Sequence, residues 1–186
     1  MDVAECLLEF YKTKCIERNC KFINSESTRT YIEKVAHWLC KEDKKFGLLL
    51  YGNVGAGKTT ILKAIAHMIN YILSNEAHDA KFRDIRSIVS GDIVDMYYNA
   101  PSLYTEMKEY KMLTIDELGC ENLKQKDFGT NLMIDILQYR YRRQLFTIVT
   151  SNLSDEDFKE RYFDRIDDRG REMFDRLHFD NESFRK

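Results

Sequence analysis

Residues 47–59 read GLLLYGNVGAGKT, and this stretch predicts the fold class of the chain. The stretch opens with a short continuous apolar run, which is typical of a strand buried on both faces of a parallel sheet. Gly52 to Thr59 then match G-x-x-x-x-G-K-[ST] at every fixed position. Residues 59–73 are apolar nearly all round, which predicts a largely covered helix. Strand, loop and helix together predict half of a βαβ unit.

The glycine-rich loop predicts a phosphate-binding site. Its glycines let successive backbone N–H groups turn inward, and the helix N-terminus adds partial positive charge. Lys58 is expected to reach the β- and γ-phosphates of a nucleotide, and the Thr59 hydroxyl to ligate Mg²⁺. The alternative is a glycine-rich turn with an exposed lysine. The predicted nucleotide-binding residues of the loop are Gly52, Asn53, Val54, Gly55, Ala56, Gly57, Lys58, Thr59 and Thr60.

Polar side chains end two later apolar runs, residues 112–115 and 145–150, which are predicted strands. Asp116 and Glu117 follow the first run. We expect Asp116 to hold Mg²⁺ through water, and Glu117 to orient and deprotonate an attacking water. Asn152 follows the second run and could hydrogen-bond both that water and a phosphate oxygen. The alternatives are a solvated acid for Glu117 and an Asx-turn residue for Asn152.

ATP is the expected nucleotide, because the chain contains no N-K-x-D motif to recognise guanine. The nearby acidic pair predicts that the ATP is hydrolysed to ADP and phosphate.

The remaining patterns predict an α/β fold. Apolar side chains three or four apart predict helices, and short β-branched runs predict strands. Further expected elements are helices at 2–18, 28–41, 92–99 and 131–142, a helix capped by Ser154 with Asp157, and strands ending near Val89 and Phe179. Because strands alternate with helices, we expect a three-layer sandwich around a mostly parallel five-stranded sheet.

Composition narrows the class of protein. A length of 186 residues with 44% hydrophobic residues suits one compact domain. The net charge of −2 provides no overall attraction to nucleic acid or anionic membranes, so any DNA contact needs a local patch. No basic leader or membrane-length apolar run is present, so a soluble cytoplasmic protein without membrane contact is expected. Five cysteines without a C-x-x-C pair fit neither a disulfide framework nor a zinc site.

Residues 161–176 carry five arginines among acidic residues, and alone they are most simply a helix with i,i+4 ion pairs. Beside the nucleotide motifs, R-I-D-D-R at 165–169 and E-S-F-R at 182–185 have a more specific interpretation. With I-D-E-L-G at 115–119 and Arg140-Tyr141 before the Thr-Ser-Asn strand, they resemble AAA+ ATPases of the DnaC/IstB group. That group comprises bacterial and phage helicase loaders and their transposition-helper relatives.

The resemblance covers roughly residues 46–186 and implies an AAA+ ATPase core there, preceded by an N-terminal helical extension over residues 1–45. No substantial C-terminal lid is expected after this core. The resemblance also implies that Arg169, or else Arg165, is an arginine finger for ATP bound by a neighbouring subunit of a homo-oligomer. Such a finger is worth ~10³ to 10⁵ in rate. Arg185 would be a second sensor that touches the γ-phosphate in cis.

A helicase-loader-like factor in DNA replication, with a replicative helicase as partner, is the leading interpretation. A transposition helper acting on a transposase, a small-molecule phosphotransferase, and a nucleotide-dependent scaffold without turnover are the alternatives. Residues 139–143 interleave cations with aromatics and are the best candidate patch for single-stranded DNA. The competing interpretation is that their stems pack a helix end near an oligomer interface. Lys108, Lys111, Lys124 and Lys126 are no better candidates.

Overall fold

A computed structural model describes residues 2–76, 84–121, 126–163 and 167–184. Its centre is a five-stranded sheet in which every pair of neighbours is parallel, in the order β2-β3-β4-β1-β5. The strands are β1 (Gly47–Gly52), β2 (Ile85–Val89), β3 (Met112–Leu118), β4 (Phe146–Ser151) and β5 (Phe174–Phe179). The predicted α/β class and parallel sheet are therefore confirmed.

The position of β1 in the sheet follows from its sequence. Its residues from Gly47 to Leu50 are all buried, as an apolar run between two neighbours requires. It pairs with β4 through Leu50 and Thr150, and with β5 through Tyr51 and His178. The glycine-rich loop after β1 therefore emerges at the carboxyl edge of the sheet, between the ends of β4 and β5.

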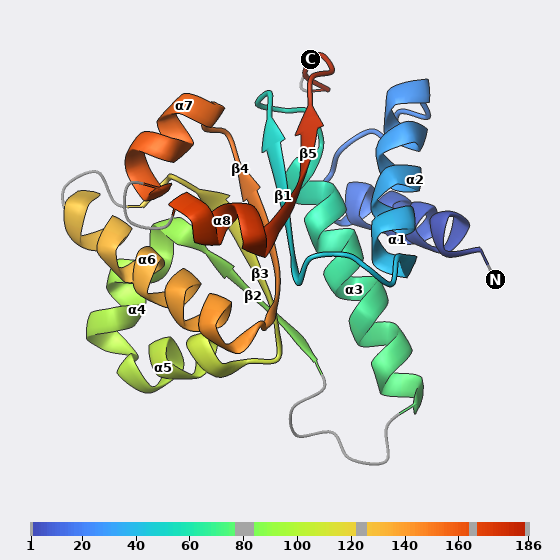
Figure 1. The fold of residues 1–186 in the computed structure, drawn as a ribbon. Coiled ribbons are helices and arrows are strands. Elements are labelled where there is room, and N and C mark those ends of the chain that lie inside the picture. The colour runs from blue at the N-terminus through green and yellow to red at the C-terminus, as the bar shows by residue number, and fades with distance from the viewer. Residues whose placement is uncertain (1, 77–83, 122–125, 164–166, 185–186) are drawn as a thin grey trace.

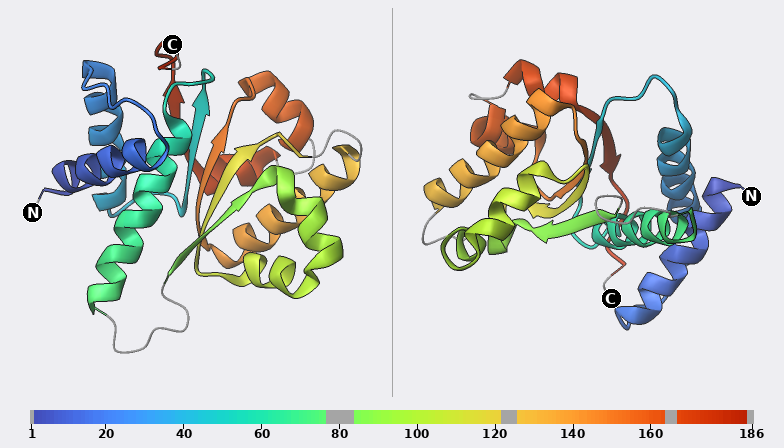
Figure 2. Two further views of the ribbon diagram at one scale, coloured as in Figure 1. Left: turned by 180° about the vertical axis from the view of Figure 1, so that it is seen from behind. Right: turned by 90° about the horizontal axis from the view of Figure 1, so that it is seen from below.

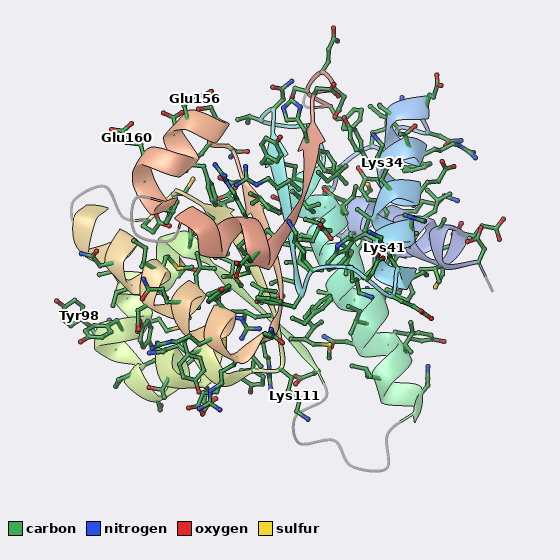
Figure 3. All side chains as sticks on the ribbon, viewed as in Figure 1. Lys34, Lys41, Tyr98, Lys111, Glu156 and Glu160 are labelled. Atoms are coloured by element: carbon green, nitrogen blue, oxygen red, sulfur yellow. The ribbon has the colours of Figure 1, made fainter. Side chains whose placement is uncertain are left out.

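Helices cover both faces of the sheet, so the molecule has three layers (Figures 1 and 2). One face carries α1 (Val3–Glu17), α2 (Glu26–Cys40) and α3 (Lys58–Glu76). The other carries α4 (Ile93–Asn99), α5 (Pro101–Glu109), α6 (Lys126–Arg143), α7 (Asp155–Phe158) and α8 (Asp167–Met173), with the short helices η1 (Ser90–Asp92) and η3 (Lys159–Phe163). Charged residues such as Lys34 and Glu156 project from the outer helices (Figure 3).

The two N-terminal helices share a core with the sheet. Leu7 of α1 and Val35 of α2 are fully buried in the same cluster as Leu48 and Ile65. The Trp38 ring lies against Phe146, and its Nε1 donates a hydrogen bond to Asp175 at 2.9 Å. The predicted division at residue 45 stays a prediction, but the helices before it complete the layer that covers this face.

The region from 161 to 176 differs from the single ion-paired helix that its composition suggests. Helix α8 is followed directly by β5, so Arg176 lies on a strand and not on a helix. Arg161 pairs with Glu121 at 2.5 Å, across 40 positions of sequence. The interpretation as one helix was wrong because apolar Phe174 and Phe179 are buried at both ends of the edge strand β5.

Across the four described ranges, none of the helices combines the length and the apolar character that spanning a bilayer requires.

Candidate functional site

The loop from Gly52 to Thr59 leaves β1 and enters α3 through three glycines with positive φ. The φ angles are 120° at Gly52, 80° at Gly55 and 97° at Gly57, a region that side chains disfavour. A methyl group at Gly52 would also lie 2.3 Å from the carbonyl oxygen of Phe179. The loop conformation therefore requires glycine, and it places the first turn of α3 at the carboxyl edge of the sheet.

Lys58 is held inside this loop. Its side chain is buried, and Nζ donates hydrogen bonds to the carbonyl oxygens of Gly52 at 2.8 Å and Asn53 at 2.7 Å. The ammonium group thus lies within the curve of the loop instead of in solvent. A lysine on a plain exposed turn, the alternative interpretation of the sequence, would not be buried.

Asp116 and Thr59 lie together, although 57 positions separate them. The Thr59 hydroxyl donates to Asp116 Oδ1 at 2.9 Å, and the buried Asp116 carboxylate also accepts from Thr150 at 2.6 Å. A hydroxyl and a carboxylate beside a phosphate-binding loop are the oxygen ligands that Mg²⁺ prefers. These residues therefore fit the metal predicted for them, and Thr59 and Asp116 would hold it.

Glu117 lies on a bulge of β3. Ile115 pairs with Val149 and Leu118 with Ser151, so two residues of β3 oppose the single residue Thr150. Glu117 has a φ of 58°, which is uncommon for a residue with a side chain. Its N–H donates to the Thr150 hydroxyl at 2.9 Å. The bulge turns the Glu117 side chain out of the sheet and toward the loop.

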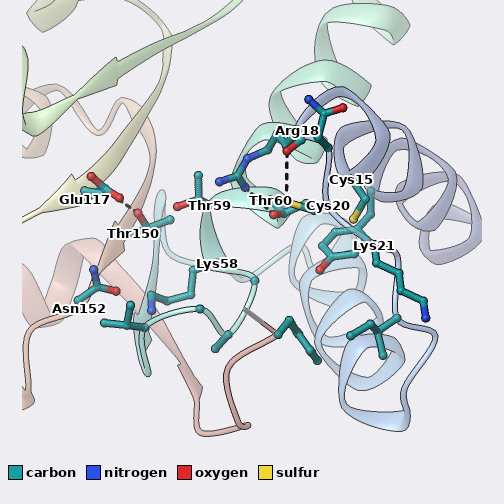
Figure 4. A pocket seen from close by; sticks show the side chains of 18 residues that line it. Cys15, Arg18, Cys20, Lys21, Lys58, Thr59, Thr60, Glu117, Thr150 and Asn152 are labelled. Carbon is teal, nitrogen blue, oxygen red and sulfur yellow. Dashed lines mark hydrogen bonds between the residues drawn. The ribbon is translucent and has the colours of Figure 1, made fainter. Parts of the chain in front are cut away.

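Four of these residues, Lys58, Thr59, Glu117 and Thr150, border one cavity of about 440 Å³ (Figure 4). Its walls include residues 54–60 of the glycine loop, Glu117, and Asn152 just past the end of β4. The volume is within the usual range of about 300–1,000 Å³ for small-molecule sites. The carboxyl edge of a parallel sheet is also the usual place for a ligand in open α/β folds.

Three predicted arginines are not placed by the structure. Arg165 and Arg185 lie outside the described residues. Arg169 is part of α8, but its side chain also lies outside the described part of the chain. The proposed finger and the second sensor therefore stay predictions.

The structure adds wall residues that sequence reasoning missed. Tyr11, Cys15 and Arg18 of the N-terminal segment line the cavity, and Phe184 near the other end of the chain joins them. The Phe184 N–H donates to the Gly55 carbonyl at 3.0 Å. No local pattern links these residues with the glycine loop, because helix packing alone brings them together.

Arg140 corrects the predicted DNA patch at 139–143. Its side chain is fully buried, and its guanidinium donates to Thr147 Oγ1 and to backbone carbonyls that include those of Tyr110 and Phe146, both at 2.7 Å. Burial lowers the pKa of Arg140, to about 9, so it stays charged at neutral pH. Arg140 joins α5, α6 and β4 and is not available to a DNA strand. Arg142 and Arg143 are exposed.

Comparison with known proteins supports the same fold. The sequence profile described as "ATPase family associated with various cellular activities (AAA)" matches residues 48–170. No curated protein matches the chain.

Three solved structures illustrate the similarity. A structure described as the DnaC helicase loader is similar at a TM-score of 0.65 and 20% identity, over 86% of this chain and 93% of that chain. A DnaI structure is similar at a TM-score of 0.62 and 21% identity, over 89% of this chain and 88% of that chain. The replication initiator DnaA, bound to AMPPCP and single-stranded DNA, is similar at 0.61 and 17%, over 87% of this chain and 49% of that chain.

At 17–21% identity, the likeness to these solved structures shows the fold alone. This chain spans about half of the DnaA chain. The AAA+ resemblance expected from the sequence is confirmed. Because the matched segment covers more than half of the chain and contains the glycine loop with Asp116 and Glu117, the chain belongs to the ATPase family associated with various cellular activities (AAA).

Proposed function

We propose that this chain binds ATP with Mg²⁺ and hydrolyses it to ADP and phosphate. The observation that carries the proposal is the grouping of phosphate-binding and acidic residues around one cavity. Lys58, Thr59 and Glu117 line this cavity, and Asp116 accepts a hydrogen bond from Thr59. Membership of an ATPase family supports the same activity.

Each residue has a distinct task in the proposed reaction. Lys58 would leave the carbonyls of Gly52 and Asn53 and bind the β- and γ-phosphates. Thr59, and Asp116 through water, would hold Mg²⁺, which would neutralise phosphate charge. Glu117 accepts a proton from a water whose oxygen attacks the γ-phosphorus. The bond from that phosphorus to the bridging oxygen breaks and leaves ADP.

Asn152 is a further residue that this chain itself contributes around the γ-phosphate and the attacking water in the proposed site. It lines the cavity together with Glu117, and this location supports the proposed sensor role. Its amide could donate to a γ-phosphate oxygen and accept from the attacking water. The amide would thereby orient the water for in-line attack.

We also propose that the active form is a homo-oligomer in which Arg169, or Arg165, completes the site of a neighbouring subunit. The arginine would neutralise charge that develops on the γ-phosphate during transfer. Support comes from the family membership and from the R-x-x-D-R segment at 165–169. Arg185 would touch the γ-phosphate from within the same chain.

The proposed biological role is that of a helicase-loader-like factor in DNA replication. It draws on the likeness to the DnaC helicase loader and on the DnaA structure with single-stranded DNA. The expected partner is a replicative helicase, with single-stranded DNA as an effector. A transposase is the alternative partner.

The test is an ATPase assay titrated with protein, single-stranded DNA and purified helicase. Wild type should show turnover per subunit that rises with protein concentration, and Arg169→Ala should lose about 10³-fold or more of it. Arg171→Ala is the matched control, because Arg171 is an exposed arginine of the same helix α8. Turnover that ignored protein concentration, DNA and helicase, and survived Arg169→Ala, would exclude the oligomeric loader.

Two further readouts separate the alternatives. Recovery of a transposase without a helicase in a pull-down would support the transposition helper. Transfer of phosphate to a nucleoside or nucleoside monophosphate, in place of free phosphate, would support a phosphotransferase.

A further inference from the structure

Arg18, at the C-terminal end of α1, reaches the start of α3. Its Nη1 donates a hydrogen bond to the Thr60 hydroxyl at 2.6 Å, across 42 positions of sequence. Both residues line the cavity that the glycine loop borders. Figure 4 shows the Arg18 guanidinium directed at the first turn of α3. The N-terminal helices therefore place a cation at the proposed nucleotide site.

The backbone that carries Arg18 has a defined geometry. Asn19 has a φ of 52°, its N–H donates to the Ile16 carbonyl at 3.0 Å, and the Cys20 N–H donates to the Cys15 carbonyl at 2.8 Å. These two bonds form a Schellman motif that ends α1 with Arg18 as the C-cap. Because Cys15 is buried in the core shared with α3, the base of the Arg18 side chain is anchored against the loop.

The surroundings of Arg18 suit an anion. Thr60 lies in the first turn of α3, where backbone N–H groups lack partners within the helix and favour negative charge. Within the described ranges, no carboxylate forms an ion pair with Arg18. A guanidinium has five N–H donors in a planar fork that matches phosphate oxygens, and Thr60 takes one of them.

The position of Thr60 along the chain indicates which phosphate of the nucleotide Arg18 would bind. The loop lysine takes the β- and γ-phosphates, while the backbone N–H groups of the loop also cradle the α-phosphate. Thr60 lies two residues beyond Lys58, further into the helix and away from the Glu117 end of the cavity. We propose that Arg18 binds the α-phosphate of the nucleotide in its own chain, so that α1 is part of the nucleotide site. The inference rests on the proposed nucleotide binding.

The test is equilibrium binding of Mg-ADP and Mg-ATP to the full chain by calorimetry. Arg18→Ala should weaken both nucleotides by the same factor, about 10- to 100-fold, as expected for a lost charged hydrogen bond. Arg18→Lys keeps the charge but loses the fork, so it should recover part of the affinity. Arg29→Ala is the matched control and should bind as wild type does, because Arg29 is exposed on α2 and bonds to Asn24.

Melting temperatures without nucleotide separate binding from folding. A contact that only joins α1 to α3 would lower this temperature in Arg18→Ala and leave the affinities of the folded protein unchanged, which would overturn the inference. A loss confined to ATP would also overturn it, because the contact would then be to the γ-phosphate. Lys58→Ala distinguishes the two proposals: if neither variant affects binding, the nucleotide site itself is wrong.

Discussion

The hydroxyl of Thr150 joins the two acidic residues of the site, because it donates to Asp116 Oδ1 at 2.6 Å and accepts from the Glu117 N–H at 2.9 Å. Thr150 is buried opposite the bulge of β3. A single side chain on β4 thus orients the proposed metal-binding carboxylate and the backbone of the proposed general base.

Thr150→Val should remove both bonds while keeping the shape of the side chain. We expect a loss of about 1–3 kcal/mol in the free energy of unfolding, because the partly buried Glu117 N–H loses its acceptor. ATP turnover should fall about 10- to 100-fold from misplaced catalytic groups. Urea denaturation and steady-state kinetics would measure the two effects. Thr150→Ser keeps the hydroxyl and should retain most of the stability and most of the ATP turnover. Equal losses in Thr150→Val and Thr150→Ser would contradict this explanation.

Glu117→Gln should separate binding from hydrolysis. The amide is nearly isosteric and cannot accept the proton from water, so kcat should fall about 10²- to 10⁴-fold while ATP affinity changes little. Nucleotide binding by calorimetry and phosphate release would check the two parts. A variant that turned over ATP at the wild-type rate would instead support a nucleotide-dependent scaffold.

Arg140→Met should destabilise the fold without acting at the cavity. It leaves the carbonyls of Tyr110 and Phe146 without their buried donor, and we expect a loss of about 3 kcal/mol in the free energy of unfolding. Arg143→Ala, on the exposed side of the same helix, should change it by less than about 0.5 kcal/mol. Chemical denaturation would measure the free energy of unfolding of both variants. A small loss in Arg140→Met would contradict this explanation, because the carbonyls would then accept hydrogen bonds from water.

Stability should fall at high pH, in part through Tyr162. Burial, followed by the neighbouring Glu121 carboxylate, raises the pKa of the Tyr162 hydroxyl, which donates to Glu121. An unfolded tyrosine loses its proton near pH 10, so above about pH 10 the unfolded chain holds fewer protons than the folded one. The free energy of unfolding must then decrease as pH rises.

Tyr162→Phe should flatten this decrease between about pH 9 and pH 11. Urea denaturation across this range would measure it, with the exposed Tyr98→Phe as control. Burial also raises the pKa values of Tyr11 and Tyr104, so a part of the decrease should remain. Identical slopes for wild type and Tyr162→Phe would rule out a contribution from Tyr162.

Local patterns were sufficient for the elements that carry the loop. The apolar run of β1, the glycines at 52, 55 and 57, and the covered helix α3 are all adjacent in sequence, so their spacing predicts their structure. The polar ends of β3 and β4 were equally predictable, because parallel strands bring their carboxyl ends to one edge. Family membership and the parallel sheet follow from these features.

Long-range packing determined the rest. Arg140 has the same local pattern as its exposed neighbours, and only the contact of α6 with α5 and β4 buries it. The bulge at Glu117 depends on pairing with Thr150, and Arg18 meets Thr60 only because α1 packs on α3. Most of these contacts join residues tens of positions apart, and their geometry depends on how whole elements pack. No short stretch of this sequence contains that information.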